Sequence, residues 1–202
     1  MGIIERKERQ KESLRMEILD AAREILLSEG YAELSMRGIA KRIEYSPTTI
    51  YLYFKNKEEL LYHLCDEVFE RLLEIIETAD IGATTAMLGL RATMRAYIYF
   101  GLSEQDRYRI TFMAGTNPYV RAEDFLEEGK NGYKLLHSFR RKVEAALAEV
   151  SSPIDPDHAV QALWAHIHGI VSLLIINPDF PWVDRDELIN TSLDIAMRGL
   201  CR

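Results

Sequence analysis

Apolar residues recur at spacings of three and four along almost the whole chain, and this spacing is typical of amphipathic α-helices. The clearest stripe comprises Leu14, Ile18, Ala21, Ala22 and Ile25. No segment shows the sustained two-residue alternation that indicates a half-buried strand, and no internal repeat is visible. The sequence therefore predicts an all-α fold.

Local signals divide the first 80 residues into four helices. Gly30 is placed to end the first helix in a left-handed conformation, and Ser35 is a good N-cap for a short second helix. Ser46 followed by Pro47 predicts the start of a third helix. Asn56, with a glutamate three residues later, resembles a capping box and predicts a long fourth helix. Further helices are expected at about residues 84–101, 104–115 (closed by Asn117-Pro118), 121–150 (with Gly129 and Gly132 as weak points), 155–177 and 185–200.

Composition favours a folded protein without a membrane span. Of the 202 residues, 48% are hydrophobic and 28% are charged, a balance typical of globular proteins. The charged N-terminus does not resemble a signal peptide, and the longest apolar run, residues 170–176, is too short to cross a bilayer. The lone cysteines, Cys65 and Cys201, suit a reducing compartment. We therefore expect a cytoplasmic protein with no membrane partner.

The net charge of −7 is unevenly distributed. Residues 1–60 carry 11 of the 25 basic and 11 of the 32 acidic side chains, so the remaining 14 basic and 21 acidic residues hold the whole excess. A neutral segment joined to an acidic body permits local contact with DNA, with repulsion elsewhere.

Residues 35–53 have the size of a helix-turn-helix. In this motif the second helix presents its exposed side to the major groove of DNA. Short hydroxyl side chains and arginine can read base edges, whereas tyrosine and lysine suit phosphate contacts. The candidate DNA-binding residues are Arg37, Ser46, Pro47, Thr48, Thr49, Tyr51, Tyr53 and Lys57.

Several spaced elements of this region resemble the N-terminal signature of TetR-family regulators. They are residues 18–24 (ILDAARE), Gly30-Tyr31, Ile39-Ala40, Ser46 and residues 49–60 (TIYLYFKNKEEL). The resemblance implies an N-terminal DNA-binding domain of three helices, joined by a fourth helix to a larger helical domain for ligand binding and dimerisation. On this basis we predict domains at residues 1–56 and 57–202.

The chain departs from the family pattern at three positions. Glu44 stands where the family often has glycine, and a left-handed glutamate costs on the order of 1 kcal/mol, which favours an adjusted turn. Tyr45 replaces the usual small aliphatic residue. Pro47 removes a side chain that often contacts bases, which narrows the possible direct readout.

The second half of the chain also has features of a dimeric sensor. Residues 162–174 resemble the Trp…His-Gly segment of one TetR C-terminal subgroup. The helix expected at residues 155–176 is apolar on nearly every side, and the last helix is amphipathic, so two helices from each subunit could form a four-helix homodimer interface.

Aromatic side chains with polar tips are candidates for a small-molecule pocket. Each taken alone is more simply a core residue, but as a set they suit an apolar site with a few polar groups. They are Tyr97, Phe100, Tyr108, Phe112, Tyr133, His137, Trp164 and His168, with Trp164 and His168 the preferred pair because they share one helical face.

Enzyme and metal-binding functions are disfavoured by the motifs. His166 and His168 are two residues apart, so they point to different sides of a helix, and the chain has no HExxH, P-loop or GxSxG sequence. Asp155 with His158 is more simply explained by an N-cap aspartate. We predict no catalytic residues, no metal and no cofactor.

The resulting hypothesis is a ligand-responsive regulator, more simply a repressor than an activator, that binds a palindromic operator as a homodimer. An effector of unknown identity would favour a different arrangement of the two recognition helices and release the DNA. The alternatives are a constitutive or activating regulator without a ligand, and a helical binding scaffold.

Overall fold

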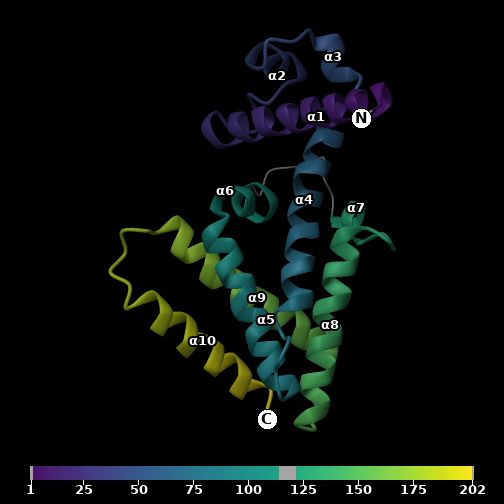
Figure 1. Ribbon diagram of the computed structural model, residues 1–202. Helices are drawn as coiled ribbons and strands as arrows, with labels where there is room; N and C mark the ends of the chain where they lie inside the picture. The colour runs from purple at the N-terminus through teal and green to yellow at the C-terminus, as the bar shows by residue number, and fades with distance from the viewer. Residues whose placement is uncertain (1, 114–121, 202) are drawn as a thin grey trace. The chain divides into compact units, whose positions relative to one another are not determined.

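The computed structural model describes residues 2–113 and 122–201, and these residues are 76% helical with no strand (Figure 1). The all-α prediction is therefore confirmed. The helices are α1 (Ile3–Ser28), α2 (Met36–Arg42), α3 (Pro47–Tyr51), α4 (Lys57–Thr78), α5 (Ala86–Ser103), α6 (Gln105–Tyr108) with the π-helical turn η1 (Arg109–Met113), α7 (Ala122–Leu126), α8 (Asn131–Glu149), α9 (Pro156–Ile176) and α10 (Arg185–Gly199).

The predicted start signals are used as expected. The side chain of Ser35 accepts a hydrogen bond from the backbone N–H of Gly38 (3.1 Å), and Asn56 Oδ1 accepts one from Glu59 N–H (2.8 Å). Gly30 has a φ of 87°, the left-handed conformation predicted after the first helix. These caps satisfy backbone donors that a helix end leaves unpaired.

Two expected helices are wrong in detail. The long helix predicted at residues 121–150 is broken into α7 and α8, because Gly129 adopts a φ of 90° between them. Gly132 begins α8 in such close contact with Phe125 that an added Cβ would lie 2.9 Å from the Phe125 carbonyl oxygen. The helix expected at residues 104–115 changes from α to π hydrogen bonding at Arg109, and its predicted end at Asn117-Pro118 lies outside the described residues.

The chain packs as two compact units. The N-terminal unit comprises residues 1–67 and 106–124, and the C-terminal unit comprises residues 68–105 and 125–202. Helix α4 contributes its first half to one unit and its second half to the other. The predicted division at residue 56 remains a prediction about function, whereas these units describe packing.

The core of the N-terminal unit is formed by the inward faces of the first four helices. Its buried side chains bring α1, α2, α3 and α4 together, and removing such surface from water is the main stabilising contribution. The largest fully buried members are Ile18, Leu19, Leu34, Ile39, Ile50, Phe54 and Leu60.

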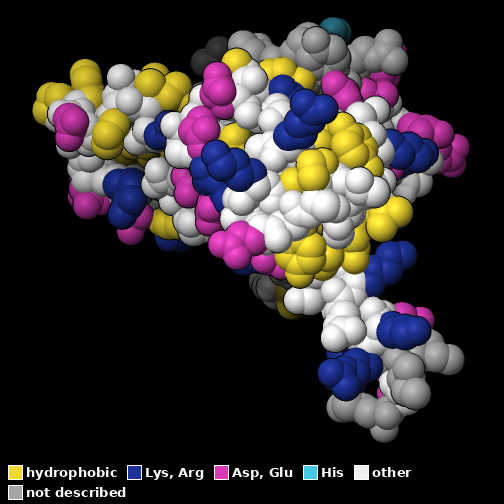
Figure 2. Space-filling model, turned by 90° about the horizontal axis from the view of Figure 1, so that it is seen from above, with side chains coloured by type: hydrophobic (Ala, Val, Ile, Leu, Met, Phe, Trp, Pro, Cys, Tyr) yellow, Lys and Arg dark blue, Asp and Glu magenta, His cyan; other side chains and the backbone are white. Residues whose placement is uncertain are grey.

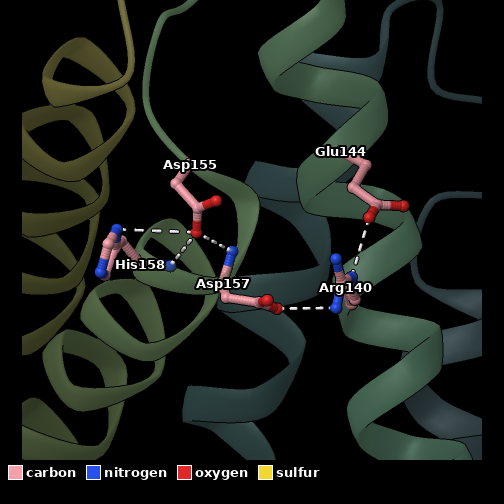
Figure 3. A network of polar contacts seen from close by, with 5 residues as sticks. All are labelled: Arg140, Glu144, Asp155, Asp157 and His158. Atoms are coloured by element: carbon pink, nitrogen blue, oxygen red, sulfur yellow. Dashed lines mark hydrogen bonds and ion pairs between the residues drawn. The ribbon is translucent and has the colours of Figure 1, made fainter.

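In the C-terminal unit, α5 packs against α8, α9 and α10, and α8 packs against α9. The start of α9 is held by Asp155, whose carboxylate accepts hydrogen bonds from the N–H groups of Asp157 (2.9 Å) and His158 (3.1 Å), as the N-cap interpretation predicted. Arg140 of α8 then bridges Glu144 (2.8 Å) and Asp157 (2.7 Å), which ties α8 to the first turn of α9 (Figure 3).

Candidate functional site

The turn between α2 and α3 keeps the geometry of a helix-turn-helix despite its unusual residues. Glu44 adopts a φ of 59°, so the expected adjustment of the turn does not occur and the glutamate itself takes the left-handed conformation. The N–H of the next residue, Tyr45, then bonds to the carbonyl of Ala40 (2.9 Å) and closes the end of α2. The left-handed backbone conformation of Glu44 therefore destabilises the fold locally by about 1 kcal/mol.

Helix α3 has a buried side and an exposed side, as predicted. Ile50 is fully buried, and Phe54, four residues further on, is 1% exposed. Pro47 and Thr48 are exposed, and Tyr51 is 53% exposed. The exposed side of α3 can therefore enter a groove of DNA without disturbing the core.

Arg37 is also exposed, on the first turn of α2. No hydrogen bond or ion pair of its guanidinium is found among the described residues. Such a side chain is able to bond two acceptors of a guanine at once.

Three of the predicted contact residues are engaged inside the protein. Ser46 Oγ accepts the N–H of Thr49 (3.2 Å), and the two hydroxyls lie 2.9 Å apart and bond to each other. Lys57 Nζ donates to the carbonyl of Tyr31 (2.7 Å) and lies 3.5 Å from the centre of its ring. Burial lowers the pKa of Lys57, although the neighbouring Glu58 raises it. These three residues stabilise the helix-turn-helix through bonds within the protein. A contact with DNA would use the donors and acceptors that these bonds leave available.

Tyr53 is half-buried against the core of the N-terminal unit, whereas two residues that were not predicted are exposed. Tyr45 is 43% exposed in the turn, and Leu52 is 77% exposed at the C-terminal end of α3. Leu52 could have been found from the sequence, because it lies four residues after Thr48 and outside the inward Ile50 and Phe54 positions.

Helix α4 is coupled to other helices of the N-terminal unit through a partly buried carboxylate. Glu67 is 23% exposed and accepts a hydrogen bond from Arg23 of α1 (3.3 Å). Burial raises its pKa, while the positive charges of Arg23, Arg107 and Arg15 lower it. One carboxylate on α4 thus attracts arginines from α1 and from α6, so these three helices are coupled electrostatically.

Of the predicted effector residues, one group lies between α5 and α9 in the C-terminal unit. Tyr97 and Phe100 are both 3% exposed on α5, and Trp164 Nε1 donates to the hydroxyl of Tyr97 (3.2 Å). The rings of Trp164 and His168 are 6.4 Å apart, and His168 Nε2 lies 3.2 Å from Ser172 Oγ. Burial lowers the pKa of His168, which favours its neutral form.

The eight predicted residues are divided between the two packing units. Tyr133 and His137 stack on α8 with ring centres 4.2 Å apart, and His137 is exposed. Tyr108 and Phe112 stack 4.8 Å apart in the N-terminal unit, where Tyr108 is fully buried. The sequence indicated which aromatic pairs meet along a helix, but not which unit each pair stabilises.

The C-terminal unit also has a polar hollow that sequence reasoning missed. It has a volume of about 710 Å³ and lies between the end of α4, the start of α5 and the middle of α8. Lys142 and Asp80 form an ion pair (2.5 Å) in its wall, and Ser138 is one of its buried lining residues. Over residues 2–113 and 122–201, no group of three or more His, Cys, Asp or Glu residues is arranged to hold a metal ion.

One helix, α9, is long and apolar enough to cross a membrane by length and composition alone. Only a third of its most apolar window is buried within the chain, and its buried residues lie on one face. The opposite face carries exposed apolar side chains, including Leu173 and Ile176.

Comparisons with known proteins agree with this architecture. Residues 18–64 match the family model described as bacterial regulatory proteins, tetR family, and residues 90–198 match the tetracyclin repressor-like C-terminal domain. The fatty acid metabolism regulator protein of Bacillus subtilis is 41% identical over 192 residues, which cover 95% of this chain and 98% of that protein. The transcriptional activator FasR of Mycolicibacterium smegmatis is 25% identical, with 94% of this chain and 84% of that protein covered.

Solved structures show the same fold. A regulatory protein of the tetR family from Rhodococcus RHA1 superposes with a TM-score of 0.73 and 23% identity, covering 92% of this chain and 96% of that one. The structure of the regulator FadR from Bacillus subtilis in complex with stearoyl-CoA superposes with a TM-score of 0.71 and 23% identity in the superposition. The superposition covers 91% of this chain and 98% of that one. With a helix-turn-helix near the N-terminus and both family models matched along its length, the chain belongs to the TetR family of DNA-binding transcriptional regulators.

Proposed function

We propose that this regulator is a homodimeric repressor whose release from its operator is caused by a fatty acyl-CoA. The observation that carries the effector class is the 41% identity, over nearly the whole length of both chains, to a regulator of fatty acid metabolism. The structure of FadR with stearoyl-CoA supports the same class of ligand for this fold.

The C-terminal unit supplies chemistry that suits such a ligand. An acyl chain requires apolar walls with a few polar groups, which is the usual composition of a small-molecule site. The helices α5, α8 and α9 supply buried apolar side chains, and the hydrogen bond from Trp164 Nε1 to the buried Tyr97 hydroxyl places polar atoms beside them. Ligand binding controls the protein only if the ligand prefers one of two arrangements.

The N-terminal unit supplies a route by which such a preference could reach DNA. Glu67 of α4 interacts with Arg23 of α1 and with Arg107 of α6, so a shift of α4 or α6 would be felt by the helix on which the helix-turn-helix packs. We propose that the effector displaces α4 as a lever and changes the separation of the two recognition helices.

The proposed dimer uses the exposed faces of α9 and α10. Leu173 and Ile176 of α9 and Ile195 of α10 are 51%, 59% and 63% exposed, and large exposed apolar surfaces mark interaction sites. The loop between these helices adds Phe180 and Val183, and Figure 2 shows hydrophobic side chains gathered at its left-hand end, where this loop lies. A second copy would cover this apolar surface, and a two-fold dimer matches a palindromic operator.

Operator binding is tested with the DNA upstream of the protein's own gene, by fluorescence anisotropy at several salt concentrations with scrambled DNA as competitor. We expect specific binding by the wild type and by Lys134→Ala, a change at an exposed residue of α8 outside the proposed dimer interface. Arg37→Ala and Tyr51→Ala should each weaken binding by about 1–3 kcal/mol, while the proteins remain folded dimers. Equal affinity of all four proteins for both DNAs would contradict the proposed interface.

The effector is tested on the bound complex by adding stearoyl-CoA, with free stearate and free CoA as separate controls. Release by the thioester alone supports the proposed effector class. A complex that persists at saturating acyl-CoA would refute ligand control by this class and leave a constitutive regulator.

One alternative has a specific observation in its favour, because the relative FasR is a transcriptional activator. A promoter-reporter strain with and without the gene distinguishes the two. A rise in transcription on deletion indicates a repressor, and a fall indicates an activator.

A further inference from the structure

The exposed side of α3 is more apolar than its predicted role in hydrogen bonding requires. Leu52 is 77% exposed, an unusually high value for a leucine in a folded protein. It forms the C-cap of α3 with helical backbone angles (φ −74°, ψ −20°), so it continues the helix by one residue. Its position on the surface is therefore fixed by the helix and does not depend on a mobile loop.

Thr48 lies four residues before Leu52 and is also exposed. Residues four apart lie on the same face of a helix, so the γ-methyl of Thr48 and the δ-methyls of Leu52 form one short apolar strip. The inward neighbours Ile50 and Phe54 are buried, so the strip faces away from the core.

Two hydroxyls near the start of α3 are bonded to each other, and Tyr51 is suited to phosphate contact. The strip of Thr48 and Leu52 is therefore a main candidate for base readout on α3. Ser46 Oγ caps the helix and bonds to Thr49 Oγ1 (2.9 Å), so these two hydroxyls are already paired. Pro47 has no polar side-chain atom.

In the major groove, the thymine 5-methyl group is the one apolar feature by which the four bases differ. We propose that Thr48 and Leu52 recognise thymines of the operator through their 5-methyl groups. Arg37 on α2 is then the polar reader, and the strip on α3 selects A·T pairs beside it. This inference rests on the proposed operator binding.

The test uses a duplex that the full-length protein selects from a random library. Each thymine of the selected site is replaced in turn by deoxyuridine, which removes only the methyl group and keeps the pairing. Burial of one methyl corresponds to about a fourfold change in affinity. We expect a loss of this size at one or two thymines per half-site, and no loss at thymines in the flanking DNA.

Two variants assign each methyl to its reader. Leu52→Ala shortens an exposed side chain, and Thr48→Ser deletes one methyl while keeping the hydroxyl, so both proteins should fold, as circular dichroism can verify. Each variant should bind the thymine duplex several-fold more weakly than the wild type and should become insensitive to deoxyuridine at the thymine it contacts.

The inference is overturned if no deoxyuridine substitution weakens binding, or if both variants keep the full sensitivity of the wild type. It is also overturned if Leu52→Ala alters dimerisation and leaves DNA affinity unchanged, because Leu52 would then meet protein. Failure to select any specific duplex would instead refute the proposed operator binding.

Discussion

Replacing Ser138 by alanine should stabilise the protein. Ser138 is 2% exposed in the middle of α8, and its hydroxyl has no hydrogen-bond partner within the described residues. A buried hydroxyl without a partner costs about 1–3 kcal/mol, because it loses its bonds to water and gains none. Alanine removes this group and also has a higher helix propensity than serine by roughly 0.5 kcal/mol. The expected gain in the free energy of unfolding is about 1.5–3.5 kcal/mol.

The assay is urea denaturation followed by circular dichroism, at one fixed protein concentration because dimerisation would add to the apparent stability. With a slope of about 1–3 kcal/mol per molar urea, the midpoint should rise by on the order of 1 M. Thr93→Val is the matched control, since Thr93 is a fully buried hydroxyl of α5 that donates to the carbonyl of Gly89 (2.9 Å). The free energy of unfolding of this control should fall by about 0.5–1.5 kcal/mol.

Ser138→Ala should therefore raise the urea midpoint, and Thr93→Val should lower it. If Ser138→Ala lowers the midpoint as Thr93→Val does, the hydroxyl has a partner in solution and the reasoning from burial is refuted. A change in the slope would instead show that the variant alters the amount of surface exposed on unfolding.

Three further predictions address the dimer, pH and thiol chemistry. Leu173→Glu should weaken the dimer by at least about 30-fold in light scattering, while Lys134→Glu on α8 leaves it intact; an unchanged dimer would place the interface elsewhere. Because burial lowers the pKa of His168, its native state takes up fewer protons than the unfolded chain, so stability should be complete above pH 6.5 and fall as the pH decreases. His168→Gln should flatten this dependence, and an equally steep curve would assign it to other groups. Burial raises the pKa of Cys65 to about 11, so in a Cys201→Ser variant a disulfide reagent should react only after unfolding, and rapid reaction of the native protein would show that this thiol is accessible.

The helices and the recognition motif could be read from the sequence because their signals are local. Ser35, Asn56 and Gly30 act within one turn of their own positions, and the Ile50 and Phe54 spacing defines the buried side of α3. The sequence does not indicate contacts between residues that lie far apart in the chain.

The contacts of Lys57 illustrate this limit. Its ammonium group bonds to a carbonyl 26 residues earlier in the chain, and no local pattern predicts that pairing. The placement of the aromatic candidates depends on tertiary structure in the same way. Their spacing indicates which rings stack along one helix, but the assignment of Tyr108 to one packing unit and Tyr97 to the other is a result of tertiary structure.

The division of the chain into its two units has a consequence for synthesis on the ribosome. The N-terminal unit is built from residues 1–67 and 106–124, so part of it emerges only after residues 68–105 have been made. Domains generally fold as units, and α1, α2, α3 and the first half of α4 can form a core early. Glu67, however, meets the positive charge of Arg107 only when the later segment has been translated. A nascent chain that could already present its recognition helix would therefore still lack the contacts with α6, and the completed regulator appears only late in translation.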